Sequence, residues 1–371
     1  MGNAGLRLVG PGVPRGARHR RDRSPRAAMA GILSLLGGPV GIDYQPDRTI
    51  LQEISLPVAD QLAEVELRLE RAQEGAPPAA ARAYRHMLQG GGKRLRPLVL
   101  LLGAEAIGEY NGRVLQAAVA VEQVHLASVI HDDVVDNTRS RRGRDSVRML
   151  LGDRQAVLVG DYLVAQIYRQ LAARDDSRVV SMLTETIVQM CLGALQEMQW
   201  RYQAATEPDY LRTIAAKTAV LMQASARLGA VCAGADPRME QVLGRYGYDL
   251  GIAFQIRDDI LDLYGDPAIL GKPIGQDLQA GQSTLPVIHA LQQPGADPLQ
   301  ELIEQFIVQG SEPEQVARAT QLVDRLGGRE YAEHRARHHV DQAQEALTEL
   351  RESLARDALS RLADYVVERH H

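Results

Sequence analysis

Apolar residues recur at spacings of three and four along nearly all of the chain after residue 48, and this periodicity constrains the fold most strongly. The segments that carry it are predicted to be helices: 54–72, 95–107, 115–135, 155–172, 179–202, 210–232, 239–263, 299–308, 314–326 and 331–367. Breaks fall at Gly or Pro, and alternating strand-like runs are scarce. The sequence therefore predicts an all-α fold, a single large helical bundle.

Composition sets the class of protein. Of the 371 residues, 42 are Lys or Arg and 47 are Asp or Glu, which gives a net charge of −5 with 45% hydrophobic residues. This is enough apolar material for a large core. We find no run of 18 apolar residues and expect no transmembrane segment. The two cysteines, Cys191 and Cys232, stand alone in apolar helical patterns, which predicts buried thiols, a reducing compartment and a cytoplasmic location.

The basic charge is concentrated in the first residues. Residues 1–31 carry seven Arg and one acid, so the remainder of the chain is strongly acidic and is not expected to bind nucleic acid. The N-terminal segment is rich in Gly, Pro and Arg and shows no helical periodicity. We therefore expect residues 1–45 to form a disordered N-terminal extension and residues 46–371 to form one all-α domain.

Two similar acidic clusters lie inside apolar helical patterns. The first is HDDVVD, in which Asp132 and Asp136 are one helical turn apart, and the second is RDDILD, in which Asp258 and Asp262 repeat that spacing. Like charges at this spacing destabilise a helix by about 0.2–0.5 kcal/mol, and a divalent cation would offset the repulsion. All-oxygen ligands indicate Mg²⁺. A solvated acidic helix face explains one such cluster, but two identical patterns flanked by Val, Ile and Leu favour a central site between two aspartate-bearing helices.

Basic residues accompany the acidic ones. Only three of the 42 basic residues are lysines, namely Lys93, Lys217 and Lys272, which indicates places where a compact ammonium is needed. Further arginines occur in GGGKRLRP and in NTRSRRG, directly after the first acidic cluster. Carboxylates followed closely by arginines suit a site that holds a metal ion together with phosphate groups.

Several motifs occur in the order found in one family. GGGKRLRP, HLASVIHDDVVD, NTRSRRG, GDYL, KT, FQIRDDILD and GKPIGQDLQAGQSTLP together resemble the all-trans polyprenyl diphosphate synthases, over residues 48–371. The resemblance is greatest to the long-chain members of the octaprenyl and nonaprenyl type. It implies a homodimer, a site inside the helical bundle, and three Mg²⁺ ions around an allylic diphosphate. It also implies peripheral membrane contact for product release.

The resemblance assigns roles to individual residues. The direct metal ligands would be Asp132, Asp136 and Asp258, supported by Asp133, Asp259 and Asp262. Isopentenyl diphosphate would be held by Lys93, Arg96, His125 and Arg142. The allylic diphosphate would be held by Arg141, Lys217, Thr218, Gln255 and Lys272. The catalytic set is then Asp132, Asp136, Asp258, Lys217 and Lys272.

One segment departs from the family pattern. In LGALQEM, Ala194 stands where many relatives have an acid, with Glu197 nearby. The implied reaction is ionisation of the allylic diphosphate, attack by the double bond of isopentenyl diphosphate, and loss of a proton to the departing diphosphate. The Gly- and Pro-rich segment 264–286 is expected to be a long mobile loop that closes over the phosphates and excludes water.

The helix that carries the first cluster should also determine product length. Ser128 lies one turn before Asp132, and both Ser128 and its neighbour Ala127 are small. Val124 lies further back on the helix, and no aromatic residue occurs in this stretch. A long-chain product, the precursor of a quinone side chain, is therefore expected, and a twenty-carbon geranylgeranyl product is the alternative. Tyr168 on the GDYL helix is a candidate for the end of the product pocket.

Two other functions remain open. A class I terpene cyclase also uses an aspartate-rich motif, but its second metal motif differs from a repeated DDxxD, and aromatic residues make up only 4% of this chain. A non-catalytic subunit of a heteromeric synthase should have lost carboxylates or lysines, and this chain retains them.

Overall fold

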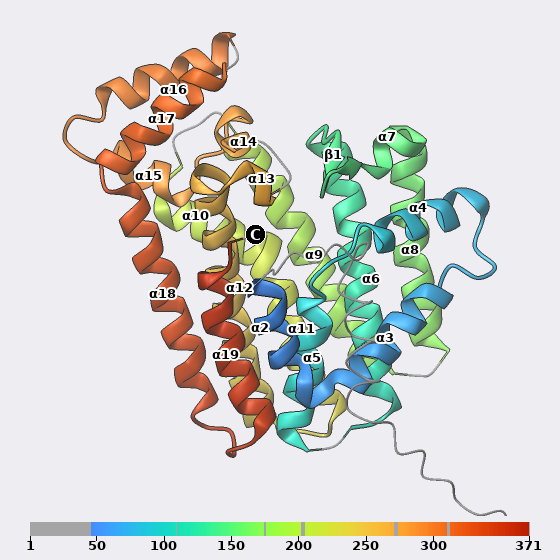
Figure 1. Cartoon of the computed structure of the whole chain (residues 1–371). Coiled ribbons are helices and arrows are strands. Elements are labelled where there is room, and N and C mark those ends of the chain that lie inside the picture. The colour runs from blue at the N-terminus through green and yellow to red at the C-terminus, as the bar shows by residue number, and fades with distance from the viewer. Residues whose placement is uncertain are drawn as a thin grey trace, which may run out of the picture.

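The computed structural model describes residues 46–108, 110–173, 176–201, 205–270, 274–309 and 312–370. Residues 1–45, the expected N-terminal extension, and Lys272 lie outside this part of the chain. The described residues are almost entirely helical, which confirms the predicted all-α class (Figure 1).

The helices and strands have the following bounds. The first half contains α2 (Pro46–Ser55), the 3₁₀-helix η1 (Leu56–Val58), α3 (Ala59–Arg71), α4 (Pro78–Gln89), α5 (Leu95–Ile107), α6 (Gly112–Val135), β1 (Ser140–Arg141), β2 (Arg144–Asp145), α7 (Val147–Leu151), α8 (Asp153–Ala172) and α9 (Ser177–Trp200). The second half contains α10 (Glu207–Ile214), the π-helix η2 (Ala215–Ala219), α11 (Val220–Cys232), α12 (Pro237–Tyr264), α13 (Pro267–Leu270), α14 (Gln276–Gln279), α15 (Leu285–Leu291), α16 (Asp297–Gln309), α17 (Pro313–Arg325), α18 (Gly328–Leu347) and α19 (Leu354–Glu368).

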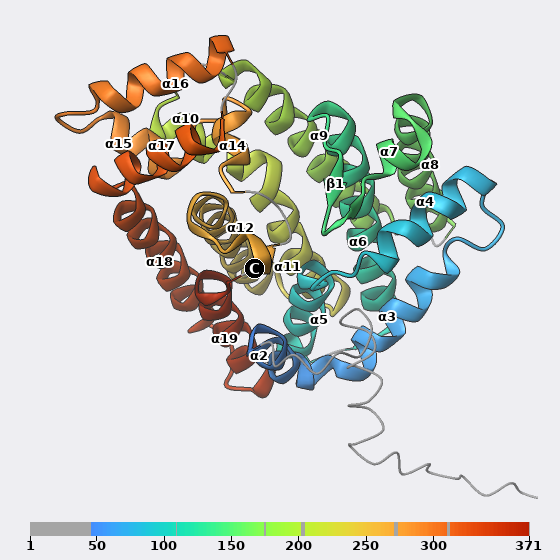
Figure 2. The same cartoon turned by 45° about the horizontal axis from the view of Figure 1, so that its top comes forward.

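Two long helices form the centre of the bundle. Figure 2 shows α12 near the middle of the molecule, and it packs against α11, α18 and α19. Helix α6 packs against α3, α5, α8 and α11. Gly251 allows the close approach of α12 to the preceding segment, because a Cβ there would lie 2.5 Å from the Cα of Ala219. Both aspartate clusters therefore lie on central helices, as the sequence predicts.

Helix α6 is apolar on almost every side, which is typical of a helix buried inside a protein. Its start is fixed by Asn111, whose side chain accepts hydrogen bonds from the backbone amides of Arg113 and Val114. By length and composition α6 and α9 could each cross a membrane, although polar residues interrupt both helices and neither contains a run of 18 apolar residues. In α6, however, 72% of the most apolar stretch is buried within the fold.

Helix α9 differs from α6 because only 22% of its most apolar stretch is buried. Its exposed apolar side chains are Val188, Leu192, Leu195 and Met198. Cys191 is exposed on the same helix, so the prediction that both cysteines are buried was wrong for Cys191 and is confirmed for Cys232. The physical reason is that no other described element of this chain covers this face of α9.

Four further departures concern local structure. Helix α4 was not predicted, and the predicted helix over 210–232 is interrupted by the π-helix η2. The predicted helix over 331–367 is divided into α18 and α19. In place of one long loop, the segment after α12 contains the short helices α13 and α14. Helix periodicity continues across such breaks, so apolar spacing alone does not reveal them.

Candidate active site

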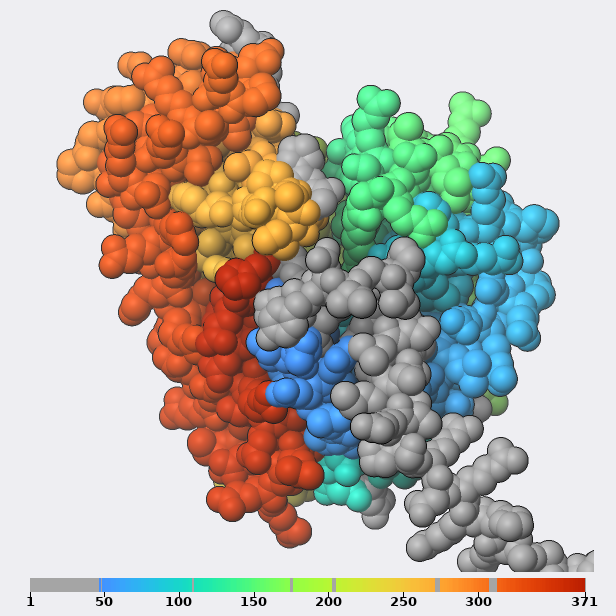
Figure 3. Space-filling model, in the orientation of Figure 1, coloured from blue at the N-terminus to red at the C-terminus, as the bar shows by residue number. Residues whose placement is uncertain are grey.

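The two aspartate clusters lie at the C-terminal ends of α6 and α12. The C-terminal end of a helix is its negative pole, where each added carboxylate costs about 0.3–1 kcal/mol. Such a placement is poor for stability and favourable for binding cations. Figure 3 shows α13–α14, in gold, and the β1–β2 hairpin with α7, in green, on the same face of the molecule. These two groups of elements follow the two clusters directly in the sequence.

The first cluster contains three carboxylates in different surroundings. Asp133 is fully buried and forms an ion pair with Arg141 at 2.8 Å. Asp136 accepts a hydrogen bond from Nη2 of Arg201 at 2.7 Å. Burial raises the pKa of Asp132, and the nearby ammonium of Lys217 opposes that rise. Arg201, at the end of α9, is a partner that no sequence pattern indicated.

Arg141 is positioned by a tight hairpin. Strands β1 and β2 pair antiparallel, with Ser140 opposite Asp145 and Arg141 opposite Arg144. The two turn residues, Arg142 and Gly143, have φ of +52° and +70°, as the two-residue turn favoured in hairpins requires. The NTRSRRG segment therefore folds back on itself and brings its arginines beside α6.

The lysine–threonine pair lies on the π-helix η2, between the two clusters. Lys217 Nζ forms an ion pair with Oε2 of Glu197 at 2.5 Å. Burial disfavours the charged ammonium, but Glu197 and Asp132 outweigh it and raise the pKa of Lys217. Gly193 makes this approach possible, because a Cβ there would lie 2.5 Å from the backbone nitrogen of Lys217. Glu197, three residues after Ala194, is thus the acid of this segment that contacts Lys217.

A chain of hydrogen bonds joins η2 to the second cluster. The Thr218 hydroxyl donates to Oε1 of Gln255 at 2.9 Å, and the Gln255 amide donates to Asp259 at 2.8 Å. Tyr210 donates to the other oxygen of Asp259 at 2.6 Å. Burial raises the pKa of Asp259 to about 7. Both carboxylate oxygens of Asp259 therefore accept hydrogen bonds from protein side chains, and this suits the predicted supporting role.

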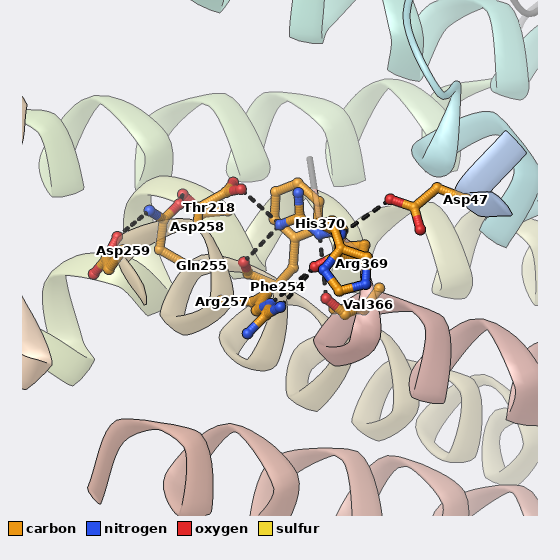
Figure 4. A network of polar contacts seen from close by, with 10 residues as sticks. All are labelled: Asp47, Thr218, Phe254, Gln255, Arg257, Asp258, Asp259, Val366, Arg369 and His370. Carbon is orange, nitrogen blue, oxygen red and sulfur yellow. Dashed lines mark hydrogen bonds and ion pairs between the residues drawn. The ribbon is translucent and has the colours of Figure 1, made fainter. Parts of the chain in front are cut away.

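The remaining two aspartates of α12 differ in exposure. Asp262 is 1% exposed and accepts a hydrogen bond from the backbone amide of Asp277 at 3.0 Å, which anchors α14. The side chain of Asp258 is 39% exposed and pairs with Arg369. Figure 4 shows this pair together with Phe254, Arg257 and Asp47. Asp258 is thus the most accessible carboxylate of the second cluster.

Four residues predicted to bind isopentenyl diphosphate lie around the loop before α5. Burial, together with the nearby Arg369, lowers the pKa of Lys93 to about 7. Burial also lowers the pKa of His125 well below its ordinary value, with Arg96 and Arg142 adding to the effect. His125 is therefore neutral and can donate or accept a hydrogen bond. Arg96 has a buried Nε without a hydrogen-bond partner in the described part of the chain.

A cavity lies beside these residues, between α4, α6 and the hairpin. His125, Arg141 and Arg142 line it, together with Arg94, Glu122 and the apolar side chain of Met87. Helix α4 is joined to the hairpin because Nε2 of His86 donates to the carbonyl oxygen of Asp145 at 2.7 Å. Helix α4 therefore forms a wall of the site that sequence periodicity did not reveal.

The residues predicted to control product length are not among those that line this cavity. Ala127 and Val124 are buried in the core, and Tyr168 on α8 is partly buried. The hydroxyl of Ser128 donates to the carbonyl oxygen of His125 at 2.9 Å. Their role in product length stays a prediction.

Comparisons with known proteins agree with this arrangement. The polyprenyl synthetase family model matches residues 77–325. A short chain isoprenyl diphosphate synthase from Methanothermobacter thermautotrophicus is 36% identical, over 84% of this chain and 96% of that protein. The structure of a decaprenyl diphosphate synthase from Rhodobacter capsulatus is 33% identical, with a TM-score of 0.81 over 86% of this chain and 99% of that one.

A third comparison concerns ligands. The structure of a polyprenyl synthase from Caulobacter crescentus, complexed with calcium and isoprenyl diphosphate, is 32% identical to this chain. Its TM-score is 0.82, over 86% of this chain and 98% of that one. Relatives of this chain therefore include short-chain and long-chain enzymes at similar identity. The chain belongs to the polyprenyl synthetase family, and it is a polyprenyl diphosphate synthase, a transferase of prenyl groups.

Proposed function

We propose that this chain joins isopentenyl diphosphate to an allylic diphosphate in a Mg²⁺-dependent reaction and repeats the step to make a long-chain polyprenyl diphosphate. One observation carries the proposal. The Lys217–Thr218 pair lies between the two aspartate clusters and connects Asp132 on α6 to Gln255 and Asp259 on α12. This arrangement provides carboxylates for a metal ion and an ammonium for a diphosphate within a single site.

The donor atoms fit Mg²⁺. Asp132, Asp136 and Asp258 would supply oxygen ligands, and Mg²⁺ prefers one or two carboxylates together with waters and substrate phosphates. No group of three or more acidic, His or Cys side chains is gathered as a ready metal site among the described residues. Substrate phosphate oxygens are therefore expected to complete the coordination of up to three ions. Bound metal would neutralise the diphosphate and favour cleavage of its bond to carbon.

The basic residues divide between the two substrates. We assign Arg141, Lys217, Thr218, Gln255 and Lys272 to the allylic diphosphate, and Lys93, Arg96, His125 and Arg142 to isopentenyl diphosphate. Lys217, held as a charged ammonium by Glu197, stabilises the leaving diphosphate as the carbon–oxygen bond breaks. The double bond of isopentenyl diphosphate then forms the new carbon–carbon bond, and a proton is lost to the departing diphosphate.

Water must be excluded while the allylic cation exists. The segment after α12 is suited to this task because it follows the second cluster directly. Asp262 anchors it at two points, through the backbone amides of Gly275 and Asp277. We propose that this segment covers the phosphates when both substrates are bound.

Product length follows from the helices around the growing chain. The α6 segment contains no Phe, Tyr or Trp, and neither does α11. Helices α6, α9 and α11 contact one another behind the first aspartate cluster. An aromatic side chain is the simplest barrier to elongation, so its absence supports a long-chain product. A geranylgeranyl product is the alternative if Tyr168 or another side chain closes the pocket.

The first test is a product assay with the purified chain. Mg²⁺ and labelled isopentenyl diphosphate are combined with allylic primers of ten, fifteen and twenty carbons in separate reactions, and products are separated by length. Chains of thirty carbons or more establish the long-chain function. Termination at twenty carbons establishes the geranylgeranyl alternative. No elongation from any primer contradicts the proposal and favours a non-catalytic subunit that requires a partner chain.

We further propose that a second copy of this chain covers the exposed apolar face of α9. Val188, Leu192, Leu195 and Met198 recur at helical spacing on that face, and Val157 and Leu158 are exposed on the adjoining α8. Contiguous exposed apolar surface of this kind marks an interaction site. The enzyme would then be a homodimer.

The remaining expectations concern the cellular setting. We propose that residues 46–371 form one catalytic domain, that residues 1–45 form a separate extension, and that the enzyme acts in the cytoplasm. A polyprenyl product is strongly apolar, so its release calls for peripheral contact with a membrane. Fractionation of cells expressing the full chain, followed by a salt wash of the membrane fraction, tests the last two statements.

A further inference from the structure

Arg94 is one of the most deeply buried charged residues described in this structure. It precedes α5 with φ of +47°, a left-handed conformation that residues other than Gly rarely adopt. Its side chain is 5% exposed. Charged side chains are almost never buried to this degree unless they are paired.

Two carboxylates from different helices hold Arg94. Nε and Nη2 donate to the two oxygens of Glu66 on α3, and Nη1 donates to Glu122 on α6 at 3.2 Å. The side chains of Glu66 and Glu122 are 8% and 4% exposed. The Glu66–Arg94–Glu122 triad therefore fixes the loop before α5 against two other helices. A planar guanidinium suits this role because it presents several donors in a fixed geometry.

The triad adjoins residues assigned to isopentenyl diphosphate. Lys93 directly precedes Arg94, and Arg96 follows two residues later. Gly92 lies between two guanidinium groups, because a Cβ there would be 2.6 Å from Nη1 of Arg94 and 2.9 Å from Nη1 of Arg142. Arg142 also donates to the carbonyl oxygen of Gly91. A displacement of Arg94 would therefore move the backbone that carries Lys93 and supports Arg142.

The charges of the triad also matter. Two carboxylates face one guanidinium, so the triad has an excess of negative charge. Glu122 acts electrostatically on Arg96 and on Arg142 as well as on Arg94. The excess thus offsets the mutual repulsion of these arginines while no diphosphate is bound. Arg94 and Glu122 also line the cavity that contains His125.

We propose that the Glu66–Arg94–Glu122 triad positions the binding site for the diphosphate of isopentenyl diphosphate, with Arg94 as a positioning residue and Glu122 as the counter-ion of the neighbouring arginines. This inference rests on the proposed assignment of that substrate. It predicts that damage to the triad weakens isopentenyl diphosphate binding more than allylic binding, because Lys217, Thr218 and Gln255 of the allylic side lie on η2 and α12.

The variant Arg94→Lys tests the triad directly, because it keeps the positive charge and removes the fork of donors. We expect the KM for isopentenyl diphosphate to rise about tenfold, which is the effect expected when a buried arginine loses its two-point hydrogen bonding to a carboxylate. The KM for the allylic primer should change less than about twofold, as expected for a distant site. Calorimetric binding of isopentenyl diphosphate to metal-free enzyme should weaken by a similar factor.

Arg227→Lys is the matched control. Arg227 on α11 holds the buried carboxylate of Glu240 on α12 through two nitrogens, outside the set of residues assigned to either substrate. Both KM values of this control should stay near those of the wild type. A control that reproduces the selective loss of isopentenyl diphosphate binding overturns the proposal.

A second variant tests the triad independently of Arg94. If Arg94→Lys does not fold, Glu122→Gln takes its place, because it preserves the shape of the side chain and removes one charge. It should raise the KM for isopentenyl diphosphate selectively, by a smaller factor than Arg94→Lys. Equal increases in both KM values, or none in a folded variant, overturn the triad's role.

Failure of the overall function is distinguishable from failure of the triad. A wild-type chain that does not elongate any primer, but binds isopentenyl diphosphate more tightly than Arg94→Lys does, contradicts the proposed reaction and supports the triad. A wild-type chain that binds neither isopentenyl diphosphate nor inorganic diphosphate overturns the triad's role.

Discussion

Arg369 donates a hydrogen bond from Nη2 to Oδ1 of Asp258 at 2.6 Å, so an arginine that follows the last helix pairs with the most accessible carboxylate of the second cluster. The guanidinium of Arg369 also lies 4.3 Å from the ring centre of Phe254, and its side chain is 4% exposed. The backbone carbonyl of Arg369 accepts two hydrogen bonds from Arg257. The segment after α19 is thereby fixed against α12 at the predicted metal site.

Arg369→Gln should make Asp258 more available to divalent cations. The side chain of Asp258 is 39% exposed, so solvent screening limits the pair to about 1 kcal/mol, or about a fivefold change in metal affinity. A Mn²⁺ titration with an allylic diphosphate present should reach half-saturation at lower metal concentration. The melting temperature should fall, because the contacts with Phe254 are also lost. Arg337→Gln, which breaks a pair with Asp364 at 2.6 Å, is the control and should leave the titration unchanged.

Loss of a predicted metal ligand should abolish most of the turnover. Asp132→Ala or Asp258→Ala should lower kcat by at least about a hundredfold, as for removal of a principal electrostatic contact to the leaving group. Helicity should be unchanged, because neither side chain is a core residue. Steady-state kinetics and circular dichroism check both statements, with Asp341→Ala on the exposed side of α18 as the control. Near-normal activity in either variant would place the metal elsewhere.

Ala127→Phe should shorten the product. Ala127 is 1% exposed on α6, so the larger ring must occupy space behind the first cluster, at a cost of about 1–3 kcal/mol in stability. Ala120→Phe, placed about 10 Å further along the same helix, should stop elongation later. Chromatography of the products from one primer compares the two variants. An identical distribution from wild type and both variants would assign the end of the pocket to another helix.

The binding of isopentenyl diphosphate should weaken as pH rises above about 7. The pKa of Lys93 is about 7, below its ordinary value of 10.5, so the free enzyme loses this positive charge over that range. The unfolded chain keeps the proton to higher pH, and folding stability should therefore increase between about pH 7 and 10. KM measured from pH 6 to 9 should rise with pH in the wild type. Lys93→Arg, which stays charged, should flatten the profile, and an unchanged slope would contradict the assignment.

A charge on the exposed face of α9 should separate the proposed dimer. Leu195 is 59% exposed, and Leu195→Asp would place a carboxylate inside an apolar interface without disturbing the core. Light scattering after gel filtration should give twice the chain mass for the wild type and the chain mass for the variant. Leu354→Asp, at a residue that is 77% exposed on α19, is the control and should remain a dimer. A wild-type monomer, or binding of wild type to lipid vesicles through α9, would contradict this interface.

Local sequence patterns were sufficient for much of the fold. Helix α5 has the predicted bounds of 95 and 107, and α12 differs from its prediction by two residues at its start and one at its end. These helices have continuous apolar periodicity and clear terminal signals, such as Asp236 followed by Pro237. The sequence also identified the aspartate clusters, the lysines and the hairpin arginines, because their chemistry is evident from residue type and spacing.

Tertiary structure decided which of these residues act on one another. Arg201 with Asp136, Arg369 with Asp258, and Glu197 with Lys217 are pairs between distant segments, and no local pattern indicates them. The π-helix at Lys217 arises where α9 crosses at Gly193, so helical periodicity did not reveal it. The sequence by itself determined the helices and the kinds of chemical group available, since both depend on residues close together in the chain. Packing decided the burial, partner and charge state of each group, because these depend on which helices meet.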